Sequence, residues 1–329
     1  MKRETTKTLK VVSLLLVLFS FCAFALLPQP VRAANTVTVT VTVGTSPEGV
    51  AVTPNGQYAY VTNEGGTTVS VISTATNNVT ATVTVGSGPV GVAVTPNGDF
   101  AYVTNAGGNT VSVINTASNT ISATVTVGSN PNGLAVMPNG DYVYVANYGS
   151  DTFSVINTAT NNVTTTVTAG SNPNGVTINP NGNYAYVTNY GTGTLSVINT
   201  ATNSVTATVT VGTGPWDLAV MPNGNYTYVA NYGSDTVSVI NTATNNVAAT
   251  ITVGSKPTGV AITPSSDFAY VTNAGGTTVS VISTVTTASP TPKVPEFSNV
   301  ALVSVAVAIA VVTLCAIALT ARTRKQLRK

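Results

Sequence analysis

The sequence predicts an all-β protein whose main domain is a six-bladed β-propeller, and three observations support that prediction. A Tyr-Val-(Thr/Ala)-Asn motif recurs at a fixed interval of 42 residues. Each copy sits in the same frame of turn residues, with no insertion or deletion, and each unit contains four short stretches of strand-forming residues. A repeat of this length, built of short strands and turns, is typical of a propeller blade or a related array. The six motifs start at Tyr60, Tyr102, Tyr144, Tyr186, Tyr228 and Tyr270.

Each unit has the composition of four antiparallel strands. In the second unit we expect strands at residues 91–94, 100–103, 110–114 and 120–127. Alternating Val, Thr, Tyr and Ile place apolar groups on the pleated faces of these strands. Pro-Asn-Gly and Asn-rich segments lie between them, and Asn and Gly tolerate the positive φ angles of tight turns.

The two ends of the array complement one another. Residues 35–43 repeat the pattern of a fourth strand, whereas the sixth unit stops after its third strand at Ile282. We therefore expect the N-terminal strand to complete the last blade and close the ring. Closure removes the free sheet edges that otherwise invite aggregation.

The repeated motif, followed each time by Ser-Val-Ile (as at residues 70–72 and 112–114), closely resembles the YVTN β-propeller repeat family. That family occurs in archaeal and bacterial surface proteins, notably archaeal surface-layer proteins. The resemblance covers about 250 residues and implies a surface-layer-like protein. Seven blades are common in the family, whereas this sequence counts to six.

Both ends of the chain suggest export and anchoring. Residues 1–33 combine a basic start, an apolar run and a small-residue exit, which indicates a cleaved signal peptide, with an uncut anchor as the alternative. The propeller, at 34–286, is followed by a Pro/Thr/Ser-rich stalk at 287–299. Residues 300–321 are apolar and long enough to cross a bilayer, and 322–329 form a basic tail that stays in the cytoplasm. We expect a membrane-anchored protein with its propeller outside the cell.

A three-residue motif precedes the apolar run and resembles the PEF-CTERM archaeal sorting signal. It consists of Pro295, Glu296 and Phe297. The resemblance implies recognition and cleavage by an archaeosortase, after which a lipid would hold the protein. The alternative is a plain transmembrane anchor. Both interpretations place the propeller at the cell surface.

Charge and composition exclude several function classes. Residues 35–286 contain one base, Lys256, against eight acidic residues, which argues against nucleic acid as a partner. The chain has no His, and Cys22 and Cys315 lie in the two apolar stretches. We therefore expect no thiolate metal site, no metal centre and no cofactor in the propeller.

The blades differ at two positions, and those differences indicate a binding face. Tyr148, Tyr190 and Tyr232 follow the motif in three consecutive blades, and Trp216 with Asp217 replaces the usual Pro-x-Gly sequence. The loops that carry them open on the same face of a propeller. An aromatic arc there suits stacking on sugar rings or contact with a protein partner. The alternative is that the tyrosines pack over neighbouring loops and that Trp216 plugs the channel.

Three glycosylation sequons are expected on the opposite face. Two of them begin fourth strands and one precedes a second strand. Sugars at these positions would leave the aromatic face bare. The acceptor residues are Asn78, Asn162 and Asn225.

We expect a non-catalytic, surface-layer-like structural or adhesion protein whose partners are envelope glycans or other surface proteins. No catalytic residues are predicted, because His is absent and the repeated Asp99, Asp141 and Asp267 fall on different blades as turn residues. A calcium role for Asp151 and Asp235 is a lesser alternative to a turn role. The rival interpretation is a propeller enzyme, such as a lactonase-like hydrolase or a redox-associated propeller.

Overall fold

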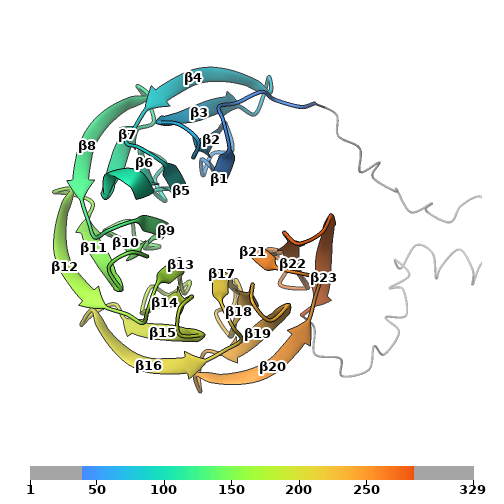
Figure 1. Cartoon of the computed structure of the whole chain (residues 1–329). Coiled ribbons are helices and arrows are strands. Elements are labelled where there is room, and N and C mark those ends of the chain that lie inside the picture. The colour runs from blue at the N-terminus through green and yellow to red at the C-terminus, as the bar shows by residue number, and fades with distance from the viewer. Residues whose placement is uncertain (1–38, 285–329) are drawn as a thin grey trace, which may run out of the picture.

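The computed structural model describes residues 39–284, and these form six antiparallel sheets arranged around a centre (Figure 1). Strands pair in sequence order within each sheet, so each 42-residue unit is one blade. The prediction of an all-β, six-bladed propeller is confirmed. A short 3-10 helix, η1 (Ala106–Gly108), is the single helix in the described part of the chain.

The strand bounds follow the repeat closely. Blade 1 contains β1 (Pro47–Val52), β2 (Tyr58–Asn63), β3 (Thr68–Ser73) and β4 (Asn78–Thr84). Blade 2 contains β5 (Pro89–Val94), β6 (Phe100–Asn105), β7 (Thr110–Asn115) and β8 (Thr120–Thr126). Blade 3 contains β9 (Pro131–Val136), β10 (Tyr142–Asn147), β11 (Thr152–Asn157) and β12 (Asn162–Thr168).

The second half of the ring repeats this order. Blade 4 contains β13 (Pro173–Ile178), β14 (Tyr184–Asn189), β15 (Thr194–Asn199) and β16 (Ser204–Thr210). Blade 5 contains β17 (Pro215–Val220), β18 (Tyr226–Asn231), β19 (Thr236–Asn241) and β20 (Asn246–Thr252). Blade 6 contains β21 (Pro257–Ile262), β22 (Phe268–Asn273) and β23 (Thr278–Ser283).

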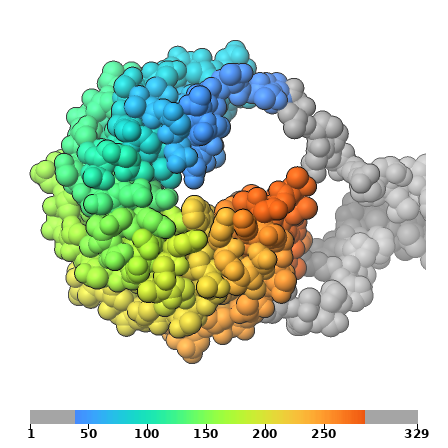
Figure 2. Space-filling view, viewed as in Figure 1, coloured from blue at the N-terminus to red at the C-terminus, as the bar shows by residue number. Residues whose placement is uncertain are grey.

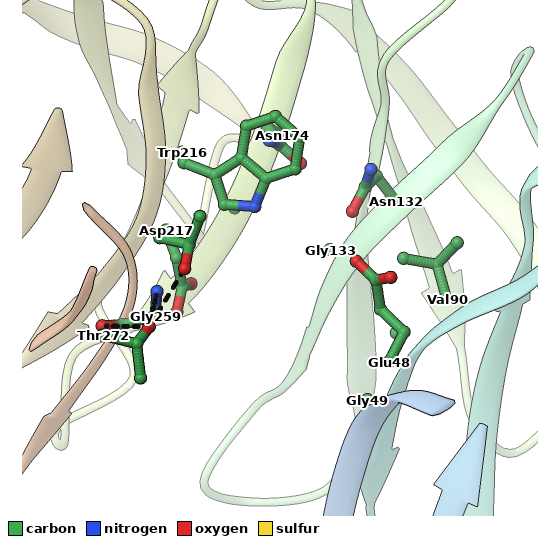
Figure 3. Close-up of a pocket in the computed structure, with 13 residues that line it drawn as sticks. Glu48, Gly49, Val90, Asn132, Gly133, Asn174, Trp216, Asp217, Gly259 and Thr272 are labelled. Atoms are coloured by element: carbon green, nitrogen blue, oxygen red, sulfur yellow. Dashed lines mark hydrogen bonds between the residues drawn. The ribbon is translucent and has the colours of Figure 1, made fainter. Parts of the chain in front are cut away.

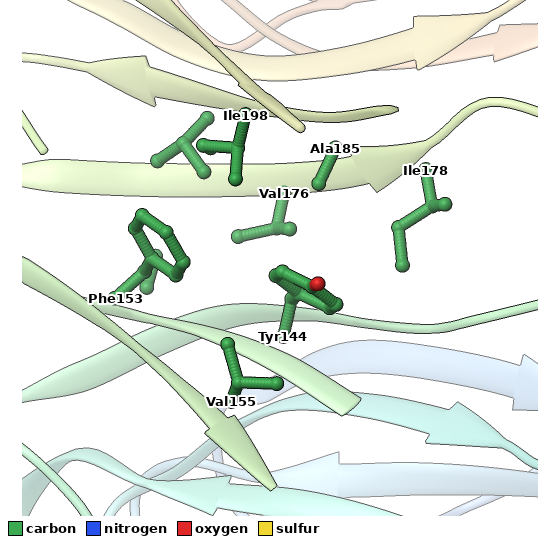
Figure 4. Close-up of a cluster of buried hydrophobic side chains, with 9 residues drawn as sticks. Tyr144, Phe153, Val155, Val176, Ile178, Ala185 and Ile198 are labelled. Carbon is green, nitrogen blue, oxygen red and sulfur yellow. The ribbon is translucent and has the colours of Figure 1, made fainter. Parts of the chain in front are cut away.

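The hydrophobic core lies between consecutive blades. Between blades 3 and 4, Tyr144 and Phe153 from one sheet face Val176 and Ile198 from the next (Figure 4). The rings of Tyr144 and Phe153 stack at a centroid distance of 6.0 Å. Because β-branched and aromatic side chains fill this space, each blade buries its apolar face against its neighbour.

Threonine hydroxyls add polar links across these interfaces. Thr62 Oγ1 donates to the backbone oxygen of Val90 at 2.7 Å, and Thr104 Oγ1 donates to that of Asn132 at 2.6 Å. The same hydroxyl accepts from a glycine backbone in its own blade, as Thr62 does from Gly49 at 2.8 Å. These bonds fix the inner strands relative to one another around the centre.

The expected closure by residues 35–43 is not found in the described part of the chain. Residues 39–43 form no strand, and β23 has no fourth-strand partner there. A space-filling view shows an open gap between blades 1 and 6 (Figure 2). As a result, Tyr270 is 43% exposed, whereas the equivalent Tyr102 is 0% exposed. Alternating composition alone does not decide which edge a strand joins, because that also requires the edge to be within reach.

The expected signal peptide, stalk, sorting motif, apolar segment and basic tail lie outside the described residues. Within residues 39–284, no helix has both the length and the hydropathy needed to span a membrane.

Candidate functional site at the centre of the ring

The first strand of every blade lies nearest the centre of the ring and contributes one variable side chain to a common cavity (Figure 1). Each of these strands has a register irregularity at its start, as between Pro215 and Leu218 in β17. Such bulges redirect side chains and are frequent beside active sites. The cavity has a volume of about 320 Å³ and opens widely to solvent. Its variable lining residues are Glu48, Val90, Asn132, Asn174, Trp216 and Thr258.

Asp217 occupies a position that is glycine in the other five blades. Those glycines allow close approach of the next blade: a Cβ atom on Gly91 would lie 2.7 Å from the backbone oxygen of Asn132, and one on Gly175 would lie 2.8 Å from that of Trp216. Blade 5 therefore departs from the packing of blades 1 to 4, in which a Cβ atom at this position would lie within 2.8 Å of a backbone oxygen of the next blade. Departures of this kind are expected at functional sites, where local packing is sacrificed for chemistry.

The carboxyl group of Asp217 is closely surrounded by protein atoms, although the residue is still partly exposed to solvent. Burial raises the pKa of Asp217 to about 6, while backbone hydrogen bonds from Leu218 and Val260 oppose part of that rise. The Val260 amide lies 3.3 Å from Oδ2 of Asp217. A carboxylate with a pKa near 6 is still mostly ionised at neutral pH and is a stronger base than an ordinary aspartate.

Asn174 contributes an unpartnered donor to the cavity wall. Its side chain is only 2% exposed, yet Nδ2 has no hydrogen-bond partner among the described residues. Buried amide groups are nearly always hydrogen-bonded, so such an orphan needs an explanation. Asn174 lines the cavity, but Nδ2 itself is buried, so an oxygen atom of a bound ligand would satisfy it only after a neighbouring side chain moves (Figure 3).

Glu48 lies across the cavity from Asp217, on the same side as Asn132 (Figure 3). Partial burial raises the pKa of Glu48, and the charge and hydrogen bonding of the neighbouring Glu64 raise it further. Sequence reasoning missed the pair of carboxyl groups formed by Glu48 and Glu64. The signal was present, because Glu48 and Glu64 occupy the two variable positions of a single blade, and both positions open on the same face.

The four aromatic residues predicted to form an arc do lie in one row. The ring centroids of Tyr148 and Tyr190 are 6.2 Å apart, and those of Tyr190 and Trp216 are 5.7 Å apart in an edge-on arrangement. Trp216 and Tyr232 are also separated by 5.7 Å, and Lys256 Nζ lies 5.7 Å from the centroid of Tyr232. Trp216 belongs to both the row and the cavity, so the two features form one continuous surface.

The remaining predicted residues lie away from this centre. Asn78 and Asn162 begin the fourth strands of their blades, Asn225 lies in the turn before β18, and all three are exposed. Asp151 and Asp235 adopt positive φ angles in turns. Their carboxylates accept backbone N–H groups at 2.8 Å, Asp151 from Asn172 and Asp235 from Lys256. In residues 39–284, no cluster of three or more His, Cys, Asp or Glu side chains is arranged to hold a metal ion.

Six radial sheets around a cavity lined by their inner strands define this protein as a β-propeller. The family model described as "Lactonase, 7-bladed beta-propeller" matches residues 22–166, which is less than half of the chain. The matched segment contains Glu48, Glu64 and Asn132 but ends before Asn174 and Asp217. A search of curated proteins found no match.

Solved structures share the fold at low sequence identity. A protein of Bacteroides uniformis provisionally described as a 6-phosphogluconolactonase is 18% identical, with a TM-score of 0.66 over 74% of this chain and 83% of its own. A counterpart from Bacteroides fragilis is 19% identical, with a TM-score of 0.65 over 74% and 81%. Hydrazine synthase of Kuenenia stuttgartiensis is 20% identical, with a TM-score of 0.53 over 76% and 99%. At these identities the likeness shows the fold alone.

The expectation that the protein is not an enzyme is contradicted by the match to the lactonase model, which the two lactonase-like structures accompany. That expectation rested on the absence of His and of converging carboxylates. The ring in fact brings Glu48 and Asp217, 169 residues apart, to one cavity. The comparisons favour the hydrolase alternative over the surface-layer interpretation.

Proposed function

We propose that this propeller is a hydrolase that opens lactones, which are cyclic esters, in the central cavity. The observation that carries the proposal is Asp217, a carboxylate with a pKa of about 6 at a position where the other blades have glycine. The match of residues 22–166 to the lactonase model supports the same reaction class. The unpartnered amide of Asn174 supplies the second group that ester hydrolysis needs.

Asp217 acts as the general base. It removes a proton from a water molecule as the water oxygen attacks the lactone carbonyl carbon. The bond between that carbon and the ring oxygen then breaks, and the leaving alkoxide takes the proton back from Asp217. One water molecule is consumed, one open-chain hydroxy acid forms, and Asp217 returns to its starting state.

Asn174 stabilises the charge that develops during the attack. Its Nδ2 group donates to the lactone carbonyl oxygen, which becomes an oxyanion in the tetrahedral intermediate. A donor aimed at a developing oxyanion stabilises it, and removing such a donor typically costs about 100-fold or more in rate. Because Asn174 is only 2% exposed and Nδ2 is itself buried, this bond requires a neighbouring side chain to move as the lactone binds.

The test is hydrolysis of D-glucono-1,5-lactone by the full-length protein near pH 6.5. Proton release measures the rate, and the rate of spontaneous hydrolysis is subtracted. We expect Asp217→Asn to lower the enzymatic rate at least about 100-fold. The matched control is Asp99→Asn, an exposed turn residue whose carboxylate accepts only from its own turn. A wild-type rate equal to the spontaneous rate, or full activity in Asp217→Asn, would overturn the proposal.

From the sequence we also propose that the propeller is exported and anchored at the cell surface, where it meets envelope glycans or surface proteins. Cleavage at the sorting motif predicts that the envelope-bound protein lacks everything after roughly Phe297. Mass spectrometry of the purified protein measures this. Recovery of peptides from residues 322–329 would exclude cleavage and leave the plain anchor.

A further inference from the structure

The charges around the cavity restrict the substrates that it can hold. Two carboxyl groups, those of Glu48 and Asp217, belong to the lining, and the lining contains no Lys or Arg. Lys256 is the single base in residues 39–284, and its ammonium group lies over the ring of Tyr232, outside the lining. The site therefore has a negative potential with no compensating cation in its wall.

A phosphorylated substrate does not fit this environment. Proteins most often bind phosphate through Arg or Lys side chains or through the N-termini of helices. In the described residues the single helix, η1, is one turn of three residues and lies outside the cavity lining. A phosphate dianion in the cavity would also be repelled by Glu48 and Asp217, because like charges at short range are destabilising.

A neutral sugar ring fits the same surface well. The indole of Trp216 offers an apolar wall at the cavity, and Tyr190 and Tyr232 extend the aromatic surface on either side of it. The C–H faces of a pyranose pack against such rings, while its hydroxyl groups bond to amide and carboxylate side chains. Asn132 and Asn174 supply amides, and Glu48 supplies a carboxyl acceptor, in the lining of the same cavity.

We propose that the cavity selects uncharged sugar lactones and rejects their phosphorylated counterparts, with the sugar ring packed on Trp216. This inference rests on the proposed lactone hydrolysis for its catalytic part, but its selectivity concerns binding and is measured separately. It assigns a substrate class that differs from the phosphorylated sugar named for the two Bacteroides structures.

The first experiment compares hydrolysis of D-glucono-1,5-lactone with that of its 6-phosphate by the full-length protein. We expect kcat/KM to be at least about tenfold higher for the neutral lactone, since one repulsive contact of this kind costs about 1.4 kcal/mol or more. Equal or faster hydrolysis of the phosphorylated lactone would overturn the selectivity and leave lactone hydrolysis intact.

The second experiment measures binding without chemistry, so that it remains decisive when neither lactone is hydrolysed. Trp216 is the chain's one tryptophan, so its fluorescence reports on this site alone. We expect D-glucono-1,5-lactam, which does not hydrolyse, to change the emission at concentrations at which its 6-phosphate does not. Absence of lactam binding, or equally tight binding of the phosphate, would overturn the inference.

A matched pair of variants locates the binding surface. Tyr190→Ala removes a ring in edge-on contact with Trp216 and should weaken lactam binding about fivefold or more. Tyr270→Ala removes an exposed tyrosine outside the aromatic row and should leave the affinity unchanged. Equal affinities for the two variants would show that the sugar does not use the aromatic row.

Discussion

The phenolic hydroxyl of Tyr102 donates to Oδ1 of Asn161 at 2.9 Å, linking the second strand of blade 2 to the turn between β11 and β12 in blade 3. Tyr60 makes the same bond to Asn119 at 2.8 Å, one blade earlier. Asn119 and Asn161 have φ angles of 54° and 52°, which asparagine adopts more readily than most residues. The tyrosine of the recurring motif thus packs in the hydrophobic core and also forms a hydrogen bond between blades.

Removal of the motif tyrosine's hydroxyl should destabilise the ring only in blades where that hydroxyl donates a hydrogen bond to the next blade. Tyr102→Phe should lower the free energy of unfolding by about 1 kcal/mol, because one hydrogen bond is lost and Asn161 is left unpaired. Tyr270→Phe should cost less than about 0.5 kcal/mol, because Tyr270 is 43% exposed at the open end. Urea unfolding of both variants measures the difference, and equal losses would contradict this account of the interface.

Ionisation of Asp217 should make the protein less stable as the pH rises from about 4 to 6. The folded-state pKa of Asp217 is about 6, against a usual value of 3.8, so the folded state binds the extra proton in this range. The contribution is fully present below pH 3.8 and is lost as the pH rises through 6.

Asp217→Asn should remove this pH dependence. At pH 7 the variant should be about 1–2 kcal/mol more stable than wild type, less than the full shift implies because the carboxyl is partly exposed. The same variant should be inactive, since the proposed base is gone. Urea unfolding of both proteins at pH 4 and pH 7 gives the difference directly. A variant no more stable at pH 7 than wild type would argue against a costly charge at this position.

Gly175→Ala should disturb the site through the backbone. The added Cβ would lie 2.8 Å from the backbone oxygen of Trp216 and 3.1 Å from Cα of Asp217, so blade 5 must shift away. We expect a loss of about 1–3 kcal/mol in stability and a lower hydrolysis rate. Gly276→Ala is the control, because a Cβ there meets nothing within 4 Å and the residue has no positive φ. Thermal unfolding distinguishes the two.

Deletion of residues 35–43 tests how the ring ends. In the structure, residues 39–43 form no strand, so the deletion should change Tm by less than about 3 °C. Closure through a fourth strand of blade 6 predicts a much larger fall in Tm and in solubility. Thermal unfolding of the deletion variant beside the wild type decides between them, and a large fall would restore the predicted closure.

The sequence by itself determined the four-strand plan of the blade and the number of blades. The fixed spacing of 42 residues, the alternating Val and Thr, and the Asn and Gly of the turns depend on local geometry, so they predicted strands such as β6 and β7 nearly to the residue. The same repeat predicted that Tyr148, Tyr190 and Tyr232 lie on one face, because they occupy equivalent positions in consecutive units. Trp216 occupies a different repeat position, and it was expected on that face because the loops that carry both positions open there.

Only the tertiary structure decided what lies at the centre and at the ends. Three features depend on how six inner strands converge, which no pattern within one repeat encodes: the presence of Glu48 and Asp217 in one cavity, the orphan amide of Asn174 and the raised pKa of Asp217. The open edge at Tyr270 likewise depends on how blades 1 and 6, which come from opposite ends of the array, lie relative to one another (Figure 2). The sequence of a single repeat does not specify that arrangement.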